Sequence, residues 1–519
     1  MTHLVKYLGI LLFIAVQGFA STITLSNPTV ISDDTVDSHC PVTRINSSGH
    51  ITAIFVQGSA IVSREKPPQE AWTTAVTLSS TDASSPKIAM DSSGNIAALW
   101  LEGTTLKIAE KPVGGSWGSA STLASSASSP EIAMSPSGDI IAVWLEASIL
   151  KTKIKKSGFS WPSTSSTISS AGASNPQVAV GGGNDLYVAW EMDAAGVPSI
   201  WISSGDLTTT LWSVESKLSS TNAVNPSLFV GDSGHVIVAW FSYVQPAMVY
   251  CRVRVSVRTK MAGSTSWSDE TDISNDGCYD PNNLKIYAAV SSNGTLLALW
   301  KHSYSGSSFV IESSVKPPMS VKWLPANILA TDEGLLDFAL FTDYDGMSVL
   351  SYMLTDSSIE SIKMIATNNE SHLRRTWATL AKFTTEMYNS CPHLHASYSP
   401  TGNHLCASVV WDSYSGSKRV VRAACANIAF VLPPTNVQVT TNIVDFYTRT
   451  ERQNVITWTA SASSDVRNYV IYRNNHIIGR VGPNVLSFTD RHRVMGEVAN
   501  YRVTALDSNL LESTPATPS

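Results

Sequence analysis

Charged residues are scarce in this sequence. They make up 15% of the chain, and 35 basic against 41 acidic residues leave a net charge of −6. A surface of this kind favours neither nucleic acid nor anionic lipid as a partner. Known metal and phosphate motifs are also missing, since there is no HExxH, no P-loop and no Cys/His zinc spacing. We therefore expect no nucleic-acid partner, no metal and no cofactor.

The first 20 residues have the composition of a signal peptide. Lys6 precedes an apolar run over residues 8–16, and small residues precede a cleavage point after Ala20. The run is shorter than the ~20 residues that a membrane-spanning helix needs, and no second long apolar run follows. We expect a monomer that is secreted, periplasmic or held at the cell surface, with no membrane span in the mature chain.

Most of the remaining chain repeats one unit. The segment Ser-Pro-Lys-Ile-Ala-Met-Asp-Ser-Ser-Gly that ends at Gly94 matches Ser-Pro-Glu-Ile-Ala-Met-Ser-Pro-Ser-Gly ending at Gly138. Such a glycine recurs every 44 to 60 residues, at Gly49, Gly94, Gly138, Gly183, Gly234, Gly294, Gly346 and Gly402. Each suits the turn between two short apolar strands, because glycine accepts a positive φ.

Thirteen of the 15 tryptophans follow the same period. Six end a second strand and seven open a fourth: Trp100, Trp144, Trp190, Trp240, Trp300 and Trp411, then Trp72, Trp117, Trp161, Trp212, Trp267, Trp323 and Trp377. Four antiparallel strands per unit are typical of a propeller blade. We predict an all-β β-propeller over residues 21–430 with about eight blades, in which these indoles pack between blades. Seven blades are the alternative, with the copy around Gly346 as an insertion.

The eighth copy lacks a fourth strand, and the mature N-terminus offers one. Residues 21–28 resemble the fourth-strand segment that begins at Ser121. We predict that Thr22–Ser26 pair with the strand around Arg419–Cys425, which would close the ring and remove an exposed sheet edge.

Six cysteines are disulfide candidates, and six allow fifteen pairings. The repeat favours three pairs: Cys40 with Cys391, Cys406 with Cys425, and Cys251 with Cys278. Each pair could instead be two buried thiols.

The repeat stops near residue 431. Beyond it, Val455-Ile-Thr-Trp458 and Asn500-Tyr501-Arg-Val-Thr-Ala stand in the order and spacing of a β-sandwich module. Residues 431–519 resemble a fibronectin type III domain, and the resemblance implies core positions for Trp458 and Tyr501. It implies a spacer or docking module without chemistry.

Acidic side chains follow several second strands. Glu102, Glu146, Glu191 and Asp412 stand just past a second-strand tryptophan, and carboxylates that converge at one face could act as an acid/base pair on a glycoside. Asp193, His302, Arg252 and Arg254 are candidates for ligand binding, the last two on one side of a third strand. A ring of solvated loop residues is the alternative interpretation.

The repeats loosely resemble the sialidase-type (BNR) repeats of exported bacterial propellers. Gly158-Phe-Ser-Trp161 keeps the Gly and Trp of that motif but not its Asp, and the Phe/Tyr-Arg-Ile-Pro signature is absent. An active sialidase is therefore disfavoured. We expect an exported binding or adhesion protein with a glycan or protein ligand. The alternative is a polysaccharide-active hydrolase or lyase, so whether the chain is an enzyme stays open.

Overall fold

The computed structural model describes residues 23–518, apart from 184, 195, 221, 232, 244–252, 275–284, 291–293, 304–308, 318–319, 333–334, 343–347, 357–358, 368–377, 386–389, 399–403, 430, 447–448, 475, 494–498, 509–511 and 514. The described residues are all-β and divide into two compact units, one over residues 23–428 and one that includes residues 429–519. In the described part of the chain, no helix is both long and apolar enough to cross a bilayer. The predicted signal peptide lies outside the described residues.

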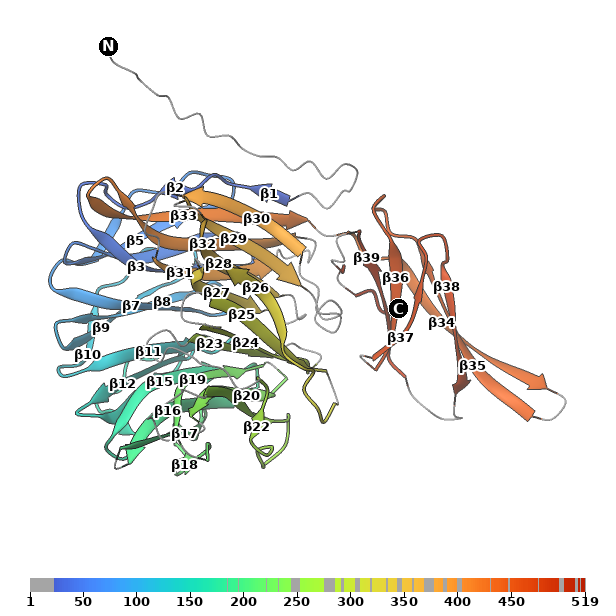
Figure 1. Cartoon of the computed structure of the whole chain (residues 1–519), viewed down its shortest axis with the longest axis horizontal. Helices are drawn as coiled ribbons and strands as arrows, with labels where there is room; N and C mark the ends of the chain where they lie inside the picture. The colour runs from blue at the N-terminus through green and yellow to red at the C-terminus, as the bar shows by residue number, and fades with distance from the viewer. Residues whose placement is uncertain are drawn as a thin grey trace, which may run out of the picture. The chain divides into compact units, whose positions relative to one another are not determined.

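The first unit is a series of antiparallel sheets, numbered here in chain order (Figure 1). Sheet 1 contains β3 (Ser38–Ile45), β4 (Ile51–Gln57), β5 (Ala60–Lys66) and β6 (Val76–Ser79). Sheet 2 contains β7 (Ala83–Met90), β8 (Ile96–Glu102), β9 (Thr105–Lys111) and β10 (Ser121–Ala124). Sheet 3 contains β11 (Ser128–Met134), β12 (Ile140–Glu146), β13 (Ile149–Lys155) and β14 (Ser166–Thr167). Sheet 4 contains β15 (Ala173–Val180), β16 (Asp185–Ala194), β17 (Val197–Asp206) and β18 (Ser216–Lys217).

The same order of four strands continues along the chain. Sheet 5 contains β19 (Ala223–Val230), β20 (Val236–Tyr243), β21 (Val253–Lys260) and β22 (Thr271–Asp272). Sheet 6 contains β23 (Lys285–Val290), β24 (Leu296–Ser303), β25 (Phe309–Lys316) and β26 (Asn327–Asp332). Sheet 7 contains β27 (Leu335–Thr342), β28 (Ser348–Asp356), β29 (Ile359–Thr367) and β30 (Ala378–Thr385). Sheet 8 contains β31 (Ser390–Tyr398), β32 (His404–Ser415) and β33 (Lys418–Ala429), with β1 (Ile23–Leu25) and β2 (Thr29–Val30) both paired to β33.

The sheets form a closed ring, which makes the unit a β-propeller. Each first strand contacts the first strand of the next sheet, and β31 of sheet 8 returns to β3 of sheet 1. The predicted closure by the N-terminal strand is confirmed, because β1 pairs with β33 (Figure 1). The predicted register is wrong: Ile23 lies opposite Ile428 and Leu25 opposite Ala426, while Arg422 and Ala423 pair with β2. The N-terminal strands thereby cover an edge that would otherwise be open.

A β-bulge explains the repeated dipeptide that ends in proline. In sheets 1 to 5 the residue before this proline has a positive φ, from 46° at Asn175 to 54° at Asn225. In sheets 1 to 5 and sheet 8, the register of the first strand shifts at this dipeptide. Proline donates no backbone hydrogen bond, so it is tolerated where the ladder is already interrupted.

The turn glycines follow the predicted conformation with one exception. Gly94 and Gly138 have φ values of 90° and 88°, and Gly49, Gly234 and Gly294 are also positive. Gly183 is not among the positive-φ residues, so that part of the prediction is wrong. It follows Gly181 and Gly182, and three successive glycines allow this turn other conformations. Gly346 and Gly402 lie outside the described residues.

The tryptophans pack between sheets, as predicted. All six second-strand indoles, such as Trp100 and Trp144, are fully buried. Fourth-strand indoles are partly buried against the adjoining core, and Trp161 packs on a cluster made by sheets 2 and 3. Trp377 lies outside the described residues.

The second unit has two three-stranded sheets. One contains β34 (Thr435–Phe446), β35 (Arg449–Thr459) and β38 (Ser487–Arg493); the other contains β36 (Asn468–Arg473), β37 (His476–Val481) and β39 (Tyr501–Leu506). Trp458 and Tyr501 are buried in its core at 5% and 4% exposure, as expected for core positions.

Candidate functional site

Glu102 and Glu146 end the second strands of sheets 2 and 3, where each accepts a hydrogen bond from an indole. Trp100 Nε1 donates to Glu102 at 3.4 Å, and Trp144 Nε1 donates to Glu146 at 2.8 Å. Glu102 also accepts from Ser79 Oγ at 2.6 Å. A buried N–H without an acceptor is costly, so both carboxylates complete the core packing of their own sheets.

Glu191 and Asp412 stand one residue earlier in the repeat and have a different role. Glu191 accepts from the backbone N–H of Asn225, and Asp412 Oδ2 accepts from that of Cys40 at 3.4 Å. Asn225 and Cys40 are the positive-φ residues of the bulge in the following sheet. Each carboxylate therefore satisfies an amide that the bulge leaves without a strand partner.

The four candidate carboxylates are thus held in two kinds of structural contact on four different sheets. Side chains alternate between the two faces of a strand, so a shift of one residue after tryptophan turns the carboxylate from its own indole to the next sheet. The hydrogen bonds above join each of the four to a separate partner rather than to another of the four.

Of the four candidate ligand residues, the three that the structure describes have separate contacts. Asp193 is exposed and accepts from Gly196 N at 2.7 Å. His302 is buried, with Nε2 3.2 Å from Glu312 Oε2. Arg254 pairs with Asp272 at 2.8 Å on the partly exposed side of β21. Arg252 lies outside the described residues.

Glu312 is a further carboxylate partner of a buried indole that the sequence analysis missed. It lies opposite Trp300 in the β24–β25 hairpin and accepts from Trp300 Nε1 at 3.1 Å. Glu312 accepts an indole hydrogen bond from the third strand of its sheet, as Glu146 does from the second strand. Only the strand register could reveal this.

The structure also locates some of the predicted disulfide partners. Cys425 carries a free thiol, so no bond joins it to Cys406 in this state. Burial and the neighbouring Cys425 raise the pKa of Cys406. Cys251, Cys278 and the side chain of Cys391 lie outside the described residues. Among the side chains that are described, no group of three His, Cys, Asp or Glu is arranged to hold a metal.

One letter pattern escaped the sequence analysis. Gly114-Gly-Ser116-Trp-Gly118 matches the GxSxG spacing of many serine hydrolases. In those enzymes the serine lies on a sharp turn from strand to helix. Ser116 instead lies in an exposed connection between strands β9 and β10, so the match carries no nucleophile.

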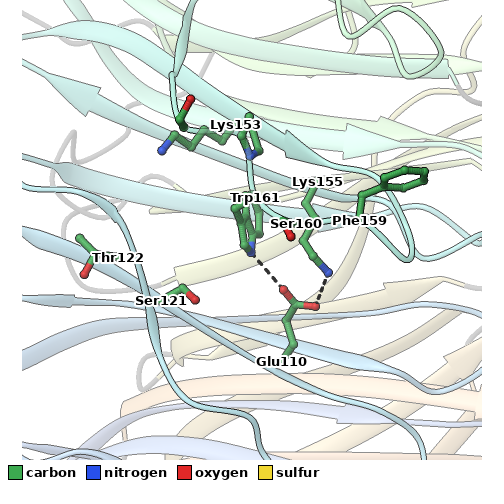
Figure 2. Close-up of a pocket in the computed structure, with 10 residues that line it drawn as sticks. Glu110, Ser121, Thr122, Lys153, Lys155, Phe159, Ser160 and Trp161 are labelled. Carbon is green, nitrogen blue, oxygen red and sulfur yellow. Dashed lines mark hydrogen bonds and ion pairs between the residues drawn. The ribbon is translucent and has the colours of Figure 1, made fainter.

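A hollow of about 600 Å³ lies at the outer strands of sheets 2 and 3, and it is the site we single out (Figure 2). Its lining comes from β9, β10, β13 and the connection that follows β13: Glu110, Ser121, Thr122, Lys153, Lys155, Phe159, Ser160, Trp161, Pro162 and Ser163. Phe159 is 72% exposed and Trp161 is half-buried. Two aromatic side chains thus line the hollow together with hydroxyls and two lysines.

Glu110 fixes the geometry of this hollow. Trp161 Nε1 donates to Glu110 Oε1 at 3.0 Å, and Lys155 Nζ lies 2.6 Å from Glu110 Oε2 (Figure 2). Lys153 Nζ donates to the carbonyl of Leu123 at 3.1 Å. One carboxylate therefore orients both the indole and an ammonium group, and the contact joins sheet 2 to sheet 3.

Sequence analysis found Trp161 but not this hollow. The repeat predicts that Trp161 packs between sheets. It does pack on the core cluster of sheets 2 and 3, but it also lines the hollow. The residues that complete the site lie some 50 positions apart, as Glu110 and Trp161 do, so only the stacking of two sheets brings them together.

No family model matches this chain. No curated protein matches it either. Among solved structures, the chain is similar to a polysaccharide lyase described as an ulvan lyase, at 11% identity and a TM-score of 0.44 over 69% of this chain and 97% of that one. It is also similar to the WD40 domain of SCAP from fission yeast, at 10% identity and a TM-score of 0.48 over 79% and 98%. A streptogramin B lyase structure gives 14% identity and a TM-score of 0.38 over 64% and 95%. Values this low leave the activity of this chain open.

Proposed function

We propose that this chain is an exported binding protein whose propeller holds a neutral glycan in the hollow between sheets 2 and 3. The observation that carries the proposal is the exposed Phe159 beside the half-buried indole of Trp161, with polar groups within the same hollow. Sugar rings present C–H groups to an aromatic face and hydroxyls to hydrogen-bond partners, which is the combination that this lining offers.

The charges of the hollow support an uncharged ligand. Glu110 and Lys155 form an ion pair at 2.6 Å. Lys153 adds one positive charge to the lining, but it is only 9% exposed and donates to a backbone carbonyl, so it presents little charge to a ligand. Ser121 and Thr122 add exposed hydroxyls. A paired carboxylate and ammonium remain able to hydrogen-bond hydroxyls without demanding a charge on the ligand.

Binding agrees with the placement of the carboxylates better than catalysis does. Glycoside chemistry needs two carboxyl groups about 5–10 Å apart on one substrate. The contacts of Glu102, Glu146 and Asp412 give these groups separate structural roles. Within the part of the chain that the structure describes, these contacts therefore do not support the hydrolase or lyase alternative.

The architecture of the proposal has three parts. Residues 1–20 direct export, as the charge and length of the N-terminal segment favour. The eight sheets that close through β1 and β33 act as eight blades of a rigid platform. Residues 431–519 act as a fibronectin type III spacer, for which the two three-stranded sheets around Trp458 are the support.

A glycan array with the mature chain tests the proposal. Thr122→Trp should fill the hollow and abolish the signal, because Thr122 is exposed and lines it. Thr77→Trp is the matched control, since Thr77 precedes Leu78 on β6 as Thr122 precedes Leu123 on β10. Silence of the wild-type chain across neutral glycans, with capture of a protein ligand instead, would overturn the glycan assignment.

A further inference from the structure

The first strands of the propeller carry charged groups on their less buried side. In β3 buried residues alternate with partly exposed ones from Pro41 to Ile45, and alternation places the partly exposed set on one side. Titratable side chains occur at such positions on six of the first strands. We call this set the axial cluster: Arg44, Lys87, Glu131, Lys285, Asp337, His393 and His395.

Two ion pairs join neighbouring strands within the axial cluster. Lys87 Nζ of β7 lies 2.5 Å from Glu131 Oε1 of β11, and these side chains are 37% and 23% exposed. Lys285 Nζ of β23 lies 2.8 Å from Asp337 Oδ1 of β27. Both pairs are reached by solvent, and each balances its own charge.

The two histidines are held as one tautomer. The backbone N–H of Thr43 donates to His393 Nδ1 at 3.2 Å, and that of Ile45 donates to His395 Nδ1 at 3.2 Å. A ring nitrogen that accepts a hydrogen bond carries no proton, so in each neutral imidazole the proton is on Nε2. The axial cluster therefore includes two N–H donors.

Arg44 supplies a charge that no described partner balances. Its Nη1 donates to the carbonyl of Thr43 at 2.9 Å, and no carboxylate among the described residues lies within ion-pair distance of it. Three cations and two anions leave the cluster at +1 when both imidazoles are neutral.

Contacts between successive first strands arrange these groups around one space, and their electrostatic interactions agree with that arrangement. Burial lowers the pKa of Arg44 to about 10, and Glu131 partly opposes that effect from two strands away. Burial, Arg44, Lys87 and Lys285 hold the pKa of His393 well below its usual value. Burial and Arg44 do the same for His395. Cations from β3, β7 and β23 therefore act on the same imidazole.

We propose that the axial cluster binds a small monocarboxylate. Arg44 makes the ionic contact, and the Nε2–H group of His393 donates a hydrogen bond to a carboxylate oxygen. A guanidinium matches a carboxylate in geometry, and one negative charge cancels the excess of +1. This site is separate from the hollow between sheets 2 and 3 and does not depend on the glycan proposal.

Calorimetric titration of the mature chain with glucuronate and with acetate tests this site. We expect both to bind, and Arg44→Gln to weaken binding at least about tenfold, the loss expected for one buried charge-assisted contact. Arg254→Gln, which alters an arginine on a third strand, should leave the affinity unchanged. Equal binding by wild type and Arg44→Gln would overturn the proposal.

A second measurement covers the case in which Arg44→Gln does not fold. A bound carboxylate raises the melting temperature of the wild-type chain, because ligand binds the folded state. Arg44→Lys keeps the charge but loses the paired N–H geometry, so its thermal shift should be smaller than that of wild type. A carboxylate site is contradicted if the wild-type melting temperature does not rise at a ligand concentration of about 100 times the Kd from calorimetry. It is also contradicted if neither calorimetry nor the thermal shift detects binding of glucuronate or acetate.

Discussion

The hollow between sheets 2 and 3 and the axial cluster use the same repeat in opposite ways. In the hollow, Glu110 and Lys155 neutralise each other beside Phe159 and Trp161. In the axial cluster, Arg44 donates to a backbone carbonyl and has no described carboxylate as a partner. Its members are charged or imidazole side chains rather than aromatic ones. One lining therefore suits a neutral ligand and the other an anion.

The difference arises from where along each unit the sequence is free to vary. Second-strand tryptophans and their neighbours are fixed by packing between sheets. The partly exposed side of the first strand and the connection before the fourth strand carry no such constraint. Charge has collected at the first of these positions, and exposed apolar side chains such as Phe159 and Leu211 at the second.

The largest expected contrast concerns acid. Burial and nearby cations hold the pKa values of His393 and His395 well below 6.5 in the folded chain. As the pH falls, the two imidazoles bind protons in the unfolded chain before they do so in the folded chain. Their contribution to the free energy of unfolding is therefore fully present above pH 6.5 and is lost as the pH drops below it. Each imidazole contributes a slope of up to about 1.4 kcal/mol per pH unit.

Urea denaturation between pH 7.5 and 5 measures that slope. The double variant His393→Asn/His395→Asn should flatten it, while His476→Asn, an exposed position on β37, should not. An unchanged slope in the double variant would show that the axial cluster does not govern acid stability.

A second contrast separates structural carboxylates from both linings. Glu146→Ala removes the acceptor of Trp144 Nε1, which is fully buried, and should cost about 1–3 kcal/mol of unfolding free energy. Glu146→Gln keeps an acceptor and should cost less. Neither should change glycan or carboxylate affinity. A loss of glycan binding without loss of stability would instead make Glu146 a ligand contact.

A third contrast raises the axial charge. Glu131→Gln frees Lys87 from its partner and takes the axial cluster from +1 to +2, so carboxylate binding should tighten about threefold to tenfold. Asp272→Asn, which removes the ion-pair partner of Arg254 on a third strand, is the control. Weaker carboxylate binding by Glu131→Gln would mean that Glu131 contacts the ligand itself.

The smallest expected effect is that of salt on the hollow. Raising NaCl from about 0.05 to 0.5 M shortens the Debye length severalfold, which should weaken carboxylate binding but change glycan affinity less than about twofold. A strong salt dependence of glycan binding would place a charged sugar in the hollow, where we expect a neutral one.

Sequence periodicity was sufficient for the propeller and its closure. Trp100 and its equivalents repeat because each fills the same space between sheets. The pairing of β1 with β33 follows from a missing fourth strand, whereas the register of that pair could not be predicted. Periodicity could not distinguish Glu146 from Glu191, because a shift of one residue reverses the face of a strand. It also could not foresee the contact of Glu110 with Trp161, or that of Thr43 with His393, since each depends on how separate sheets stack.

The most direct test of the proposed function is the affinity of Phe159→Ala for the neutral oligosaccharide that gives the strongest wild-type array signal. Phe159 is 72% exposed, so its removal should leave the fold intact. Loss of one aromatic contact of about 1.4 kcal/mol predicts about tenfold weaker binding. Leu211→Ala, at a 69% exposed position in the equivalent connection of sheet 4, should bind as wild type does. Equal affinities for wild type, Phe159→Ala and Leu211→Ala would contradict a glycan site in the hollow.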